Sequence, residues 1–227
     1  MKLAALFTGG KDSTYSIYKA SKENEVVCLM NVISANTDSY MFHTVGSVLV
    51  DMQAEAMGMP LERFYTKGEK EKELDDLKEF ISRIKEKYGV EGVVSGAIAS
   101  EYQLSRIGNI LKELGLVSIT PLWHTDVEEY MHSLVSDGFK AAIISVSAEG
   151  LDSSWLGKEI NEETLRELIT LSRKYRFHLG FEGGEAETTM LDGPIFKKRI
   201  VIKEYKVIDE GQKHYMDITK AELEDKV

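Results

Sequence analysis

The apolar positions in the first half of the chain alternate between short runs and helical stripes. Five short runs predict strands: Leu3–Phe7, Val26–Val32, Leu61–Tyr65, Gly92–Ser95 and Val117–Ile119. Between them, apolar residues recur every three or four positions along three stretches and predict amphipathic helices: 45–56, 74–84 and 104–114. Strands that alternate with helices are typical of an α/β fold with a parallel, doubly wound sheet.

The pattern of apolar positions changes after Pro121. Two helices and a buried strand are predicted there: Asp126–Val135, Asn161–Tyr175 and Phe139–Val146. The stretch His178–Gly193 has no periodicity and is expected to be a loop. Two β-rich runs close the chain as an antiparallel hairpin: Ile200–Ile208 and Tyr215–Ile218, joined through Asp209-Glu210-Gly211. We expect a nucleotide-binding domain over residues 1–121 and a smaller α+β domain over residues 122–227.

A glycine-rich segment, Thr8-Gly9-Gly10-Lys11-Asp12-Ser13, lies between the first predicted strand and a helix. Its glycines let the backbone curl around an anion, and the helix amino terminus supplies unpaired N–H groups. Lys11 can neutralise phosphate charge, and the carboxylate of Asp12 suits Mg²⁺ held between it and the phosphates. The spacing fits neither the Walker A loop nor the dinucleotide fingerprint. The segment predicts a polyphosphate site with a metal; the alternative is a plain turn with Asp12 as helix cap.

Composition narrows the classes of protein that fit this pattern. The 227 residues carry 28 Lys and Arg against 38 Asp and Glu, and the net charge of −10 argues against a large nucleic-acid surface. Apolar runs fall far short of the ~18–20 residues of a membrane span, so we expect a cytoplasmic protein without membrane association. The single cysteine, Cys28, excludes an internal disulfide and a two-cysteine sulfur relay.

Four blocks along the chain resemble known motifs. The glycine-rich segment is similar to the Ser-Gly-Gly-x-Asp-Ser motif of the N-type ATP pyrophosphatases, with Thr8 in place of serine. The string Glu182-Gly183-Gly184-Glu185-Ala186-Glu187-Thr188 resembles the signature of the diphthine–ammonia ligases within that class. Two further blocks, Ser39–Thr44 and Gly96–Gln103, also look like stretches of that family. The resemblance implies a HUP-type ATP-binding domain with a smaller substrate domain.

The family resemblance implies that the protein catalyses the last step of diphthamide formation. ATP and Mg²⁺ would activate the carboxylate of diphthine on translation elongation factor 2 as an acyl adenylate, with release of pyrophosphate, and ammonia would then displace AMP. Eukaryotic members of the family are expected to carry extra C-terminal domains, so the chain looks like the compact archaeal form. A homodimer is left open.

The predicted site combines this resemblance with position in the sheet. Ligands of doubly wound sheets bind beyond the carboxyl ends of the strands, where Ser34, Ala35 and Gly96 are expected to contact the nucleoside. For Ser34 and Ala35 the alternative is an ordinary strand end. Glu-rich turns are also common on solvated surfaces, so the acidic string has a structural alternative. The expected catalytic residues are Lys11, Asp12, Glu185 and Glu187, with Asp12 as the metal ligand. The expected ATP contacts are Thr8, Gly9, Gly10, Lys11, Asp12, Ser13, Ser34, Ala35 and Gly96. The expected substrate contacts are Tyr40, His43, Glu182, Gly183, Gly184, Glu185 and Thr188.

Two alternative functions remain at this level. One is another N-type ATP pyrophosphatase that acts on transfer RNA, by thiolation or lysidine formation; the single cysteine and the acidic charge disfavour it. The other is a nucleotide-binding regulator without catalysis, which would need neither Asp12 beside the phosphates nor the acidic string. A glutamine-dependent synthetase is disfavoured because the sequence contains no recognisable glutaminase segment.

Overall fold

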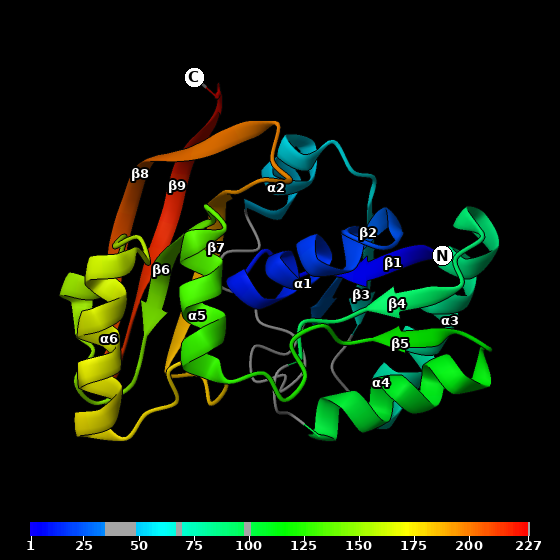
Figure 1. The fold of residues 1–227 in the computed structure, drawn as a ribbon, viewed down its shortest axis with the longest axis horizontal. Helices are drawn as coiled ribbons and strands as arrows, with labels where there is room; N and C mark the ends of the chain where they lie inside the picture. Colours follow the sequence, from blue (N-terminus) through cyan, green and yellow to red (C-terminus); the bar gives the residue numbers. More distant parts are fainter. Residues whose placement is uncertain (35–48, 67–69, 98–100, 227) are drawn as a thin grey trace. The chain divides into compact units, whose positions relative to one another are not determined.

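The computed structural model of the chain describes residues 1–34, 49–66, 70–97 and 101–226 (Figure 1). The chain divides into two compact units. The first unit comprises residues 1–8, 12–47 and 59–123, and the second comprises residues 9–11, 48–58 and 124–227. The second unit therefore includes two short segments of the N-terminal half, one of which belongs to the glycine-rich turn. The domain boundary expected at residue 121 remains a prediction.

The first unit is built on a parallel sheet of five strands in the order β3-β2-β1-β4-β5, as the alternating pattern predicted (Figure 1). The strands are β1 (Lys2–Leu6), β2 (Glu25–Ser34), β3 (Leu61–Thr66), β4 (Gly92–Val94) and β5 (Val117–Ile119). The helices are α1 (Lys11–Ser21), α3 (Lys70–Tyr88) and α4 (Glu101–Glu113). β1 pairs with β2 on one side and β4 on the other. The strand order reverses beside β1, and ligands of doubly wound sheets bind at this point.

The core of the first unit lies between the sheet and helices α3 and α4. The apolar stripe of α3 predicted from the sequence is buried, with Ile81 at 0% exposure, and it packs together with residues of α4. Ala4, Cys28 and Met30 on neighbouring strands meet this stripe, and all three are fully buried. Cys28 and Met30 are two positions apart on β2, so their side chains point to the same face of the sheet, and this face is apolar. The packing fixes β1 and with it the start of the glycine-rich turn.

The second unit contains an antiparallel sheet in the order β7-β6-β9-β8. Its strands are β6 (Lys140–Val146), β7 (Ala186–Asp192), β8 (Lys198–Glu210) and β9 (Lys213–Asp225). Its helices are α2 (Val50–Met57), α5 (Val127–Ser136), α6 (Glu162–Tyr175) and the short 3₁₀ helix η2 (Ser153–Trp155). The predicted helix starts are confirmed for α5 and α6, where the side chains of Asp126 and Asn161 accept hydrogen bonds from the first turn.

Two expectations for the second unit need correction. The stretch His178–Gly193 was expected to be a loop, but β7 lies within it and pairs with β6. The hairpin is confirmed but is longer than expected, because β8 continues through Glu210 and the turn falls at residues 211–212.

For α2, positions 45 and 48 of the expected stripe lie outside the described residues. Among the described residues, no helix has both the length and the apolar character that a membrane span requires.

The thiol of Cys28 provides a test of this fold. Cys28 is fully buried, and burial raises the pKa of its thiol to about 12, with the charge of Glu62 adding to the shift. At pH 8 the native thiol should therefore fail to react with a thiol reagent such as dithionitrobenzoate, since the thiolate is the nucleophile. Unfolding in guanidinium should release one equivalent of reactive thiol. Rapid stoichiometric labelling of the native protein would contradict the packing around β2.

Candidate functional site

The glycine-rich turn lies at the carboxyl end of β1 and leads straight into α1, which begins at Lys11. The Ser13 hydroxyl oxygen lies 3.3 Å from the backbone nitrogen of Thr8, which donates to it, and 3.1 Å from the Thr8 hydroxyl. Gly9 has φ of +81°, in the left-handed region that favours glycine. These contacts hold the turn against the first turn of the helix, where N–H groups and the helix dipole favour anions.

Gly96 packs directly on this helix start within the first unit. A Cβ atom at Gly96 would lie 2.7 Å from the backbone nitrogen of Ser13 and 2.8 Å from the carbonyl carbon of Asp12. Both neighbours are backbone atoms, so they have no rotamer to move away. The structure therefore brings Gly96 together with the start of α1 and shows that close packing there requires glycine at this position. The expected contact of Gly96 with the nucleoside remains a prediction.

Lys11 makes its contacts inside the second unit. Its backbone nitrogen donates to the Thr188 hydroxyl on β7 at 3.1 Å, and its ammonium donates to the carbonyl oxygen of Gly180 at 2.6 Å. The side chain is 1% exposed, and its nitrogen lies 5.8 Å from the ring centre of Tyr130 and 5.4 Å from that of Phe181. Such ring contacts stabilise a buried cation. Lys11 thus joins the glycine-rich turn to the segment that contains the acidic string.

Glu185 closes the loop over residues 178–185. One carboxylate oxygen accepts from the backbone nitrogen of His178 at 3.0 Å and the other accepts from that of Gly183 at 2.8 Å. Inside the loop, Phe181 has φ of +64°, an uncommon conformation for an aromatic residue. The backbone nitrogen of Ser147 donates to the Glu185 carbonyl at 2.9 Å. The carboxylate of Glu185 therefore shapes the loop that presents the Gly180 carbonyl to Lys11.

The other residues of the acidic string differ in their surroundings. Glu182, Gly183 and Gly184 are exposed. Glu187 lies on β7 with 18% of its side chain exposed, and its carboxylate is 3.7 Å from the ammonium of Lys213. Successive residues of a strand point to opposite faces, which places Glu187 on the face opposite to Thr188. The acidic string is therefore divided: residues 182–184 lie in an exposed loop, and residues 186–188 lie on β7.

The structure leaves some predicted residues apart from this cluster. Ser34 ends β2 at the carboxyl edge of the sheet, next to β1 in the strand order. Ala35, Tyr40 and His43 lie outside the described residues. Among the described residues, no group of three or more His, Cys, Asp or Glu side chains could hold a metal ion. Asp12, the expected metal ligand, is half-buried in the first turn of α1, and its role remains a prediction.

Sequence reasoning missed three residues that bond to the turn or to Lys11. Gly180 accepts from Lys11, and Met190 donates its backbone N–H to the Gly9 carbonyl at 2.8 Å. Gln53 on α2 donates to the same Gly9 carbonyl. Nothing in the local sequence distinguishes Gln53 or the two backbone partners.

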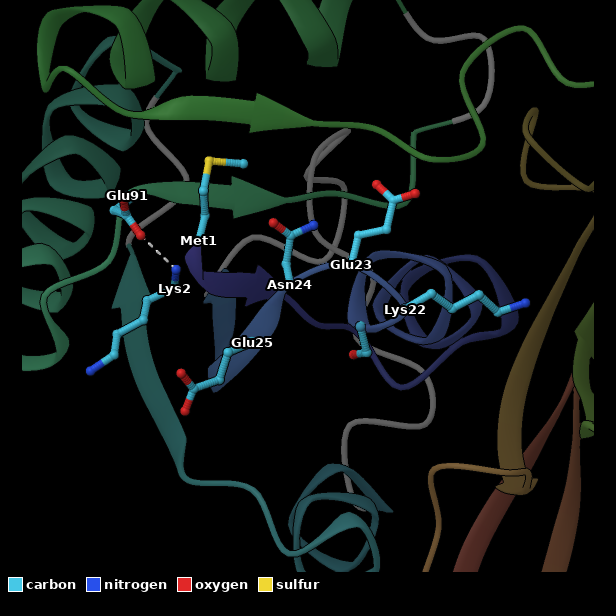
Figure 2. A pocket seen from close by; sticks show the side chains of 8 residues that line it. Met1, Lys2, Lys22, Glu23, Asn24, Glu25 and Glu91 are labelled. Carbon is cyan, nitrogen blue, oxygen red and sulfur yellow. Dashed lines mark hydrogen bonds between the residues drawn. The ribbon is translucent and has the colours of Figure 1, made fainter.

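A surface hollow elsewhere on the first unit is lined by charged side chains (Figure 2). It lies at the amino ends of β1 and β2, at the opposite end of β1 from the glycine-rich turn. Its lining carries both charges, from Lys2 and Lys22 and from Glu23, Glu25 and Glu91, and the Lys2 backbone nitrogen donates to Glu91 at 2.8 Å. Parallel sheets bind ligands at the carboxyl ends of their strands, so this hollow is not the expected nucleotide site.

The fold and turn define the chain as an α/β protein of the nucleotide-binding class, with a glycine-rich turn after the first strand at the reversal of strand order. Residues 1–118 match the family model of the diphthamide synthase N-terminal domain, and residues 126–223 match that of the C-terminal domain. The chain belongs to the diphthamide synthase family.

Relatives named diphthine–ammonia ligase support the same membership. Those from Bos taurus and Homo sapiens are 38% identical over 253 residues, which span 100% of this chain and 94% of each relative. The relative from Schizosaccharomyces pombe is 36% identical, with 100% of this chain and 40% of that protein covered. The expectation of extra domains in eukaryotic relatives fits the fission yeast protein, of which 40% is covered, and does not fit the mammalian relatives, of which 94% is covered. A solved structure described as a predicted subunit of tRNA methyltransferase from Methanocaldococcus jannaschii aligns at 15% identity with a TM-score of 0.48, over 86% of this chain and 98% of that one.

Gly96→Ala tests the packing on the start of α1. The added methyl group would meet backbone atoms at 2.7 and 2.8 Å, so we expect a loss of about 1–3 kcal/mol in the free energy of unfolding. Gly108→Ala on α4 is the matched control, because a Cβ there meets nothing within 4 Å and alanine should gain roughly 0.5–1 kcal/mol in a helix interior. Denaturant titration of both variants measures this difference, and equal stabilities would contradict the packing.

Proposed function

We propose that this chain amidates the carboxylate of diphthine on translation elongation factor 2 with ammonia, at the expense of ATP, and so forms diphthamide in the cytoplasm. Family membership and the relatives named diphthine–ammonia ligase support the proposal. The observation that carries it is the bonding of Lys11, which joins the glycine-rich turn to Thr188 and Gly180. Lys11 thus connects the segment proposed to bind ATP with the segment proposed to serve the second substrate.

ATP is needed because a carboxylate resists attack by ammonia, since its leaving group would be oxide. In the first step, a carboxylate oxygen of diphthine attacks the α-phosphorus of ATP, the bond between that phosphorus and the bridging oxygen breaks, and pyrophosphate leaves. In the second step, the ammonia nitrogen attacks the acyl carbon, AMP leaves with the electron pair of the acyl–oxygen bond, and the nitrogen loses a proton. Splitting the reaction in this way replaces one difficult displacement by two easier ones.

The glycine-rich turn is the proposed site of the β- and γ-phosphates of ATP. The backbone N–H groups of Gly9 and Gly10 and the hydroxyls of Thr8 and Ser13 are the proposed donors, and the dipole of α1 favours the negative charge. Fixed donors of this kind stabilise charge that develops on a leaving pyrophosphate. The contact between Thr8 and Ser13 supports this assignment, because it holds both hydroxyls at the same end of the turn.

Lys11 has a positioning role in this proposal. Its ammonium donates to the Gly180 carbonyl and is almost fully buried, so its contribution to the phosphates is its positive charge at the start of α1. A buried charge is weakly screened, and its field reaches neighbouring groups more strongly than an exposed one does. Lys11 thereby favours the anionic pyrophosphate while it holds the turn in place.

Mg²⁺ fits this set of residues as a companion of ATP. In proteins, Mg²⁺ is usually held by one or two carboxylates together with substrate phosphates and water. Asp12 supplies one carboxylate beside the turn, and among the described residues no larger acidic or His cluster is formed. Asp12 would hold the ion directly or through water, and the ion would neutralise charge on the leaving pyrophosphate.

The nucleoside and the protein substrate are assigned by position. Ser34, Ala35 and Gly96 are proposed to line the nucleoside side of the site, because they lie at or beyond the carboxyl ends of β2 and β4. The proposed substrate contacts are Tyr40, His43, Gly183, Gly184 and Thr188.

The three glutamates of the acidic string receive different roles. Ammonia is mostly protonated at neutral pH, so a carboxylate that binds ammonium and accepts a proton aids the second step. We assign this role to Glu182, which is exposed, and to Glu187, which lies on β7. Glu185 is a positioning residue, because its two oxygens accept backbone N–H groups of the loop.

The reaction products distinguish this proposal from its alternatives. The chain, ATP, ammonia and diphthine-bearing elongation factor 2 should yield AMP, pyrophosphate and an amidated factor, with AMP release dependent on both ammonia and the factor. A regulator that only binds nucleotide would release no AMP. An enzyme that acts on transfer RNA would release AMP with transfer RNA and leave the factor unchanged.

Asp12→Asn tests the proposed metal ligand. We expect ATP–pyrophosphate exchange to fall by about a hundredfold or more, because metal neutralisation of transition-state charge contributes several kcal/mol. The Mg²⁺ concentration for half-maximal exchange should rise. Asp75→Asn, at an exposed position on α3, is the control and should exchange as the wild type does. Wild-type exchange by Asp12→Asn at an unchanged Mg²⁺ requirement would exclude the assignment.

Glu185→Gln tests the loop over residues 178–185. The glutamine amide can accept with one oxygen only, so one of the bonds from His178 and Gly183 is lost. We expect amidation to fall by about tenfold or more, since a hydrogen bond to a charged group is worth roughly 1.5–3 kcal/mol, while ATP–pyrophosphate exchange is largely kept. The same change at exposed Glu182 keeps the loop closed and should raise the KM for ammonia instead. Unchanged amidation by Glu185→Gln would rule out this role.

A further inference from the structure

Gln53 lies on α2 with its side chain fully buried. Its amide nitrogen lies 2.8 Å from the carbonyl oxygen of Gly9 and 2.8 Å from that of Met190, and it donates to both. The Thr189 hydroxyl is a third neighbour at 3.2 Å. All four residues belong to the same compact unit. A helix distant in sequence therefore bonds directly to the glycine-rich turn.

Within the described part of the chain, the amide of Gln53 uses its nitrogen in hydrogen bonds but not its oxygen. Among the described residues, its amide oxygen is a buried acceptor with no hydrogen-bond partner. An unpartnered buried acceptor lowers stability, and an apolar side chain of similar length would fill this space without it. Gln53 is thus poorly suited to stability alone, and its benefit lies in the two donors it directs at carbonyl oxygens.

The Gly9 carbonyl is held by two donors at once. The backbone nitrogen of Met190 and the amide nitrogen of Gln53 both lie 2.8 Å from its oxygen. A carbonyl oxygen has two lone pairs, so this pair of bonds fixes its direction. The described peptide bonds are all trans, and in a trans peptide the N–H points opposite to the C=O. Fixing the Gly9 carbonyl therefore directs the Gly10 N–H away from β7 and α2.

Gly9 and Gln53 also fit each other sterically. A Cβ at Gly9 would lie 2.2 Å from the amide oxygen of Gln53, and the φ of +81° at Gly9 disfavours any other residue. The turn and the glutamine are thus closely packed, and Gln53 leaves no room for a side chain at position 9. Nothing in the local sequence around α2 indicates this pairing.

We propose that Gln53 is a positioning residue of the ATP site, which fixes the peptide between Gly9 and Gly10 so that the Gly10 N–H meets the phosphates. This rests on the proposed role of the glycine-rich turn in binding ATP. Gln53 touches neither ATP nor the second substrate; it acts through the Gly9 carbonyl alone.

Gln53→Met removes both donors and keeps the length of the side chain. Binding of the non-hydrolysable analogue α,β-methylene ATP, measured by calorimetry, should weaken by about tenfold or more, because an unfixed donor loses most of a charge-assisted hydrogen bond. Thr189→Val is the matched control: it removes the hydroxyl beside Gln53 and leaves both carbonyl acceptors of the Gln53 amide in place, and its affinity should stay within twofold of wild type. Urea titration of each variant establishes the folded fraction used in the comparison.

Gln53→Glu supplies a second readout that is independent of folding yield. At pH 8 its carboxylate would face two carbonyl oxygens and offer no donor, whereas at pH 6 burial favours the protonated carboxyl, which can donate to Gly9. The ratio of wild-type to variant affinity for the analogue should shrink as the pH falls. A ratio that does not change with pH, or affinity of Gln53→Met within twofold of wild type, would overturn the role of Gln53. Failure of the wild type itself to bind the analogue would overturn the ATP site as well.

Discussion

A lysine ammonium that is 1% exposed must find its partners inside the protein, because burial of a charge without hydrogen bonds is strongly unfavourable. Lys11 meets this requirement through the Gly180 carbonyl and two aromatic rings. That carbonyl is available because the loop over residues 178–185 is closed by the carboxylate of Glu185. The conformation of the acidic segment is therefore tied to a residue in the first turn of α1.

The glycine-rich turn is also held by β7 and α2. Thr188 accepts from the backbone of Lys11, Met190 donates to Gly9, and Gln53 adds a second donor to Gly9. Donors and charges preorganised in this way act on a transition state without reorganisation at the moment of reaction. In the proposed reaction, the same hydrogen bonds hold the residues that bind the phosphates and the segment that serves amidation. Such an arrangement suits a reaction whose two steps take place on the same acyl group.

The spacing of apolar residues predicted most of the elements, because these elements bury apolar side chains in the core. The strands of the parallel sheet and α3 are examples. The same spacing missed β7, because Thr188 and Thr189 stand where a strand would normally carry apolar side chains, and both have polar partners in the turn or on α2. The glycine-rich turn and the acidic string were recognisable as motifs. Their connection was not, since the bonds of Lys11 join residues 177 and 169 positions apart. Such partners are set by tertiary packing and leave no local pattern.

The central claim is that ATP activates the diphthine carboxylate by transfer of AMP to one of its oxygens. The most direct measurement follows ¹⁸O from a labelled diphthine carboxylate during one turnover with ATP and ammonia. Attack of the carboxylate on the α-phosphorus leaves one labelled oxygen on phosphorus, so mass spectrometry should find ¹⁸O in AMP and none in pyrophosphate. Unlabelled AMP, or label in inorganic phosphate with ADP as the product, would contradict activation by adenylation.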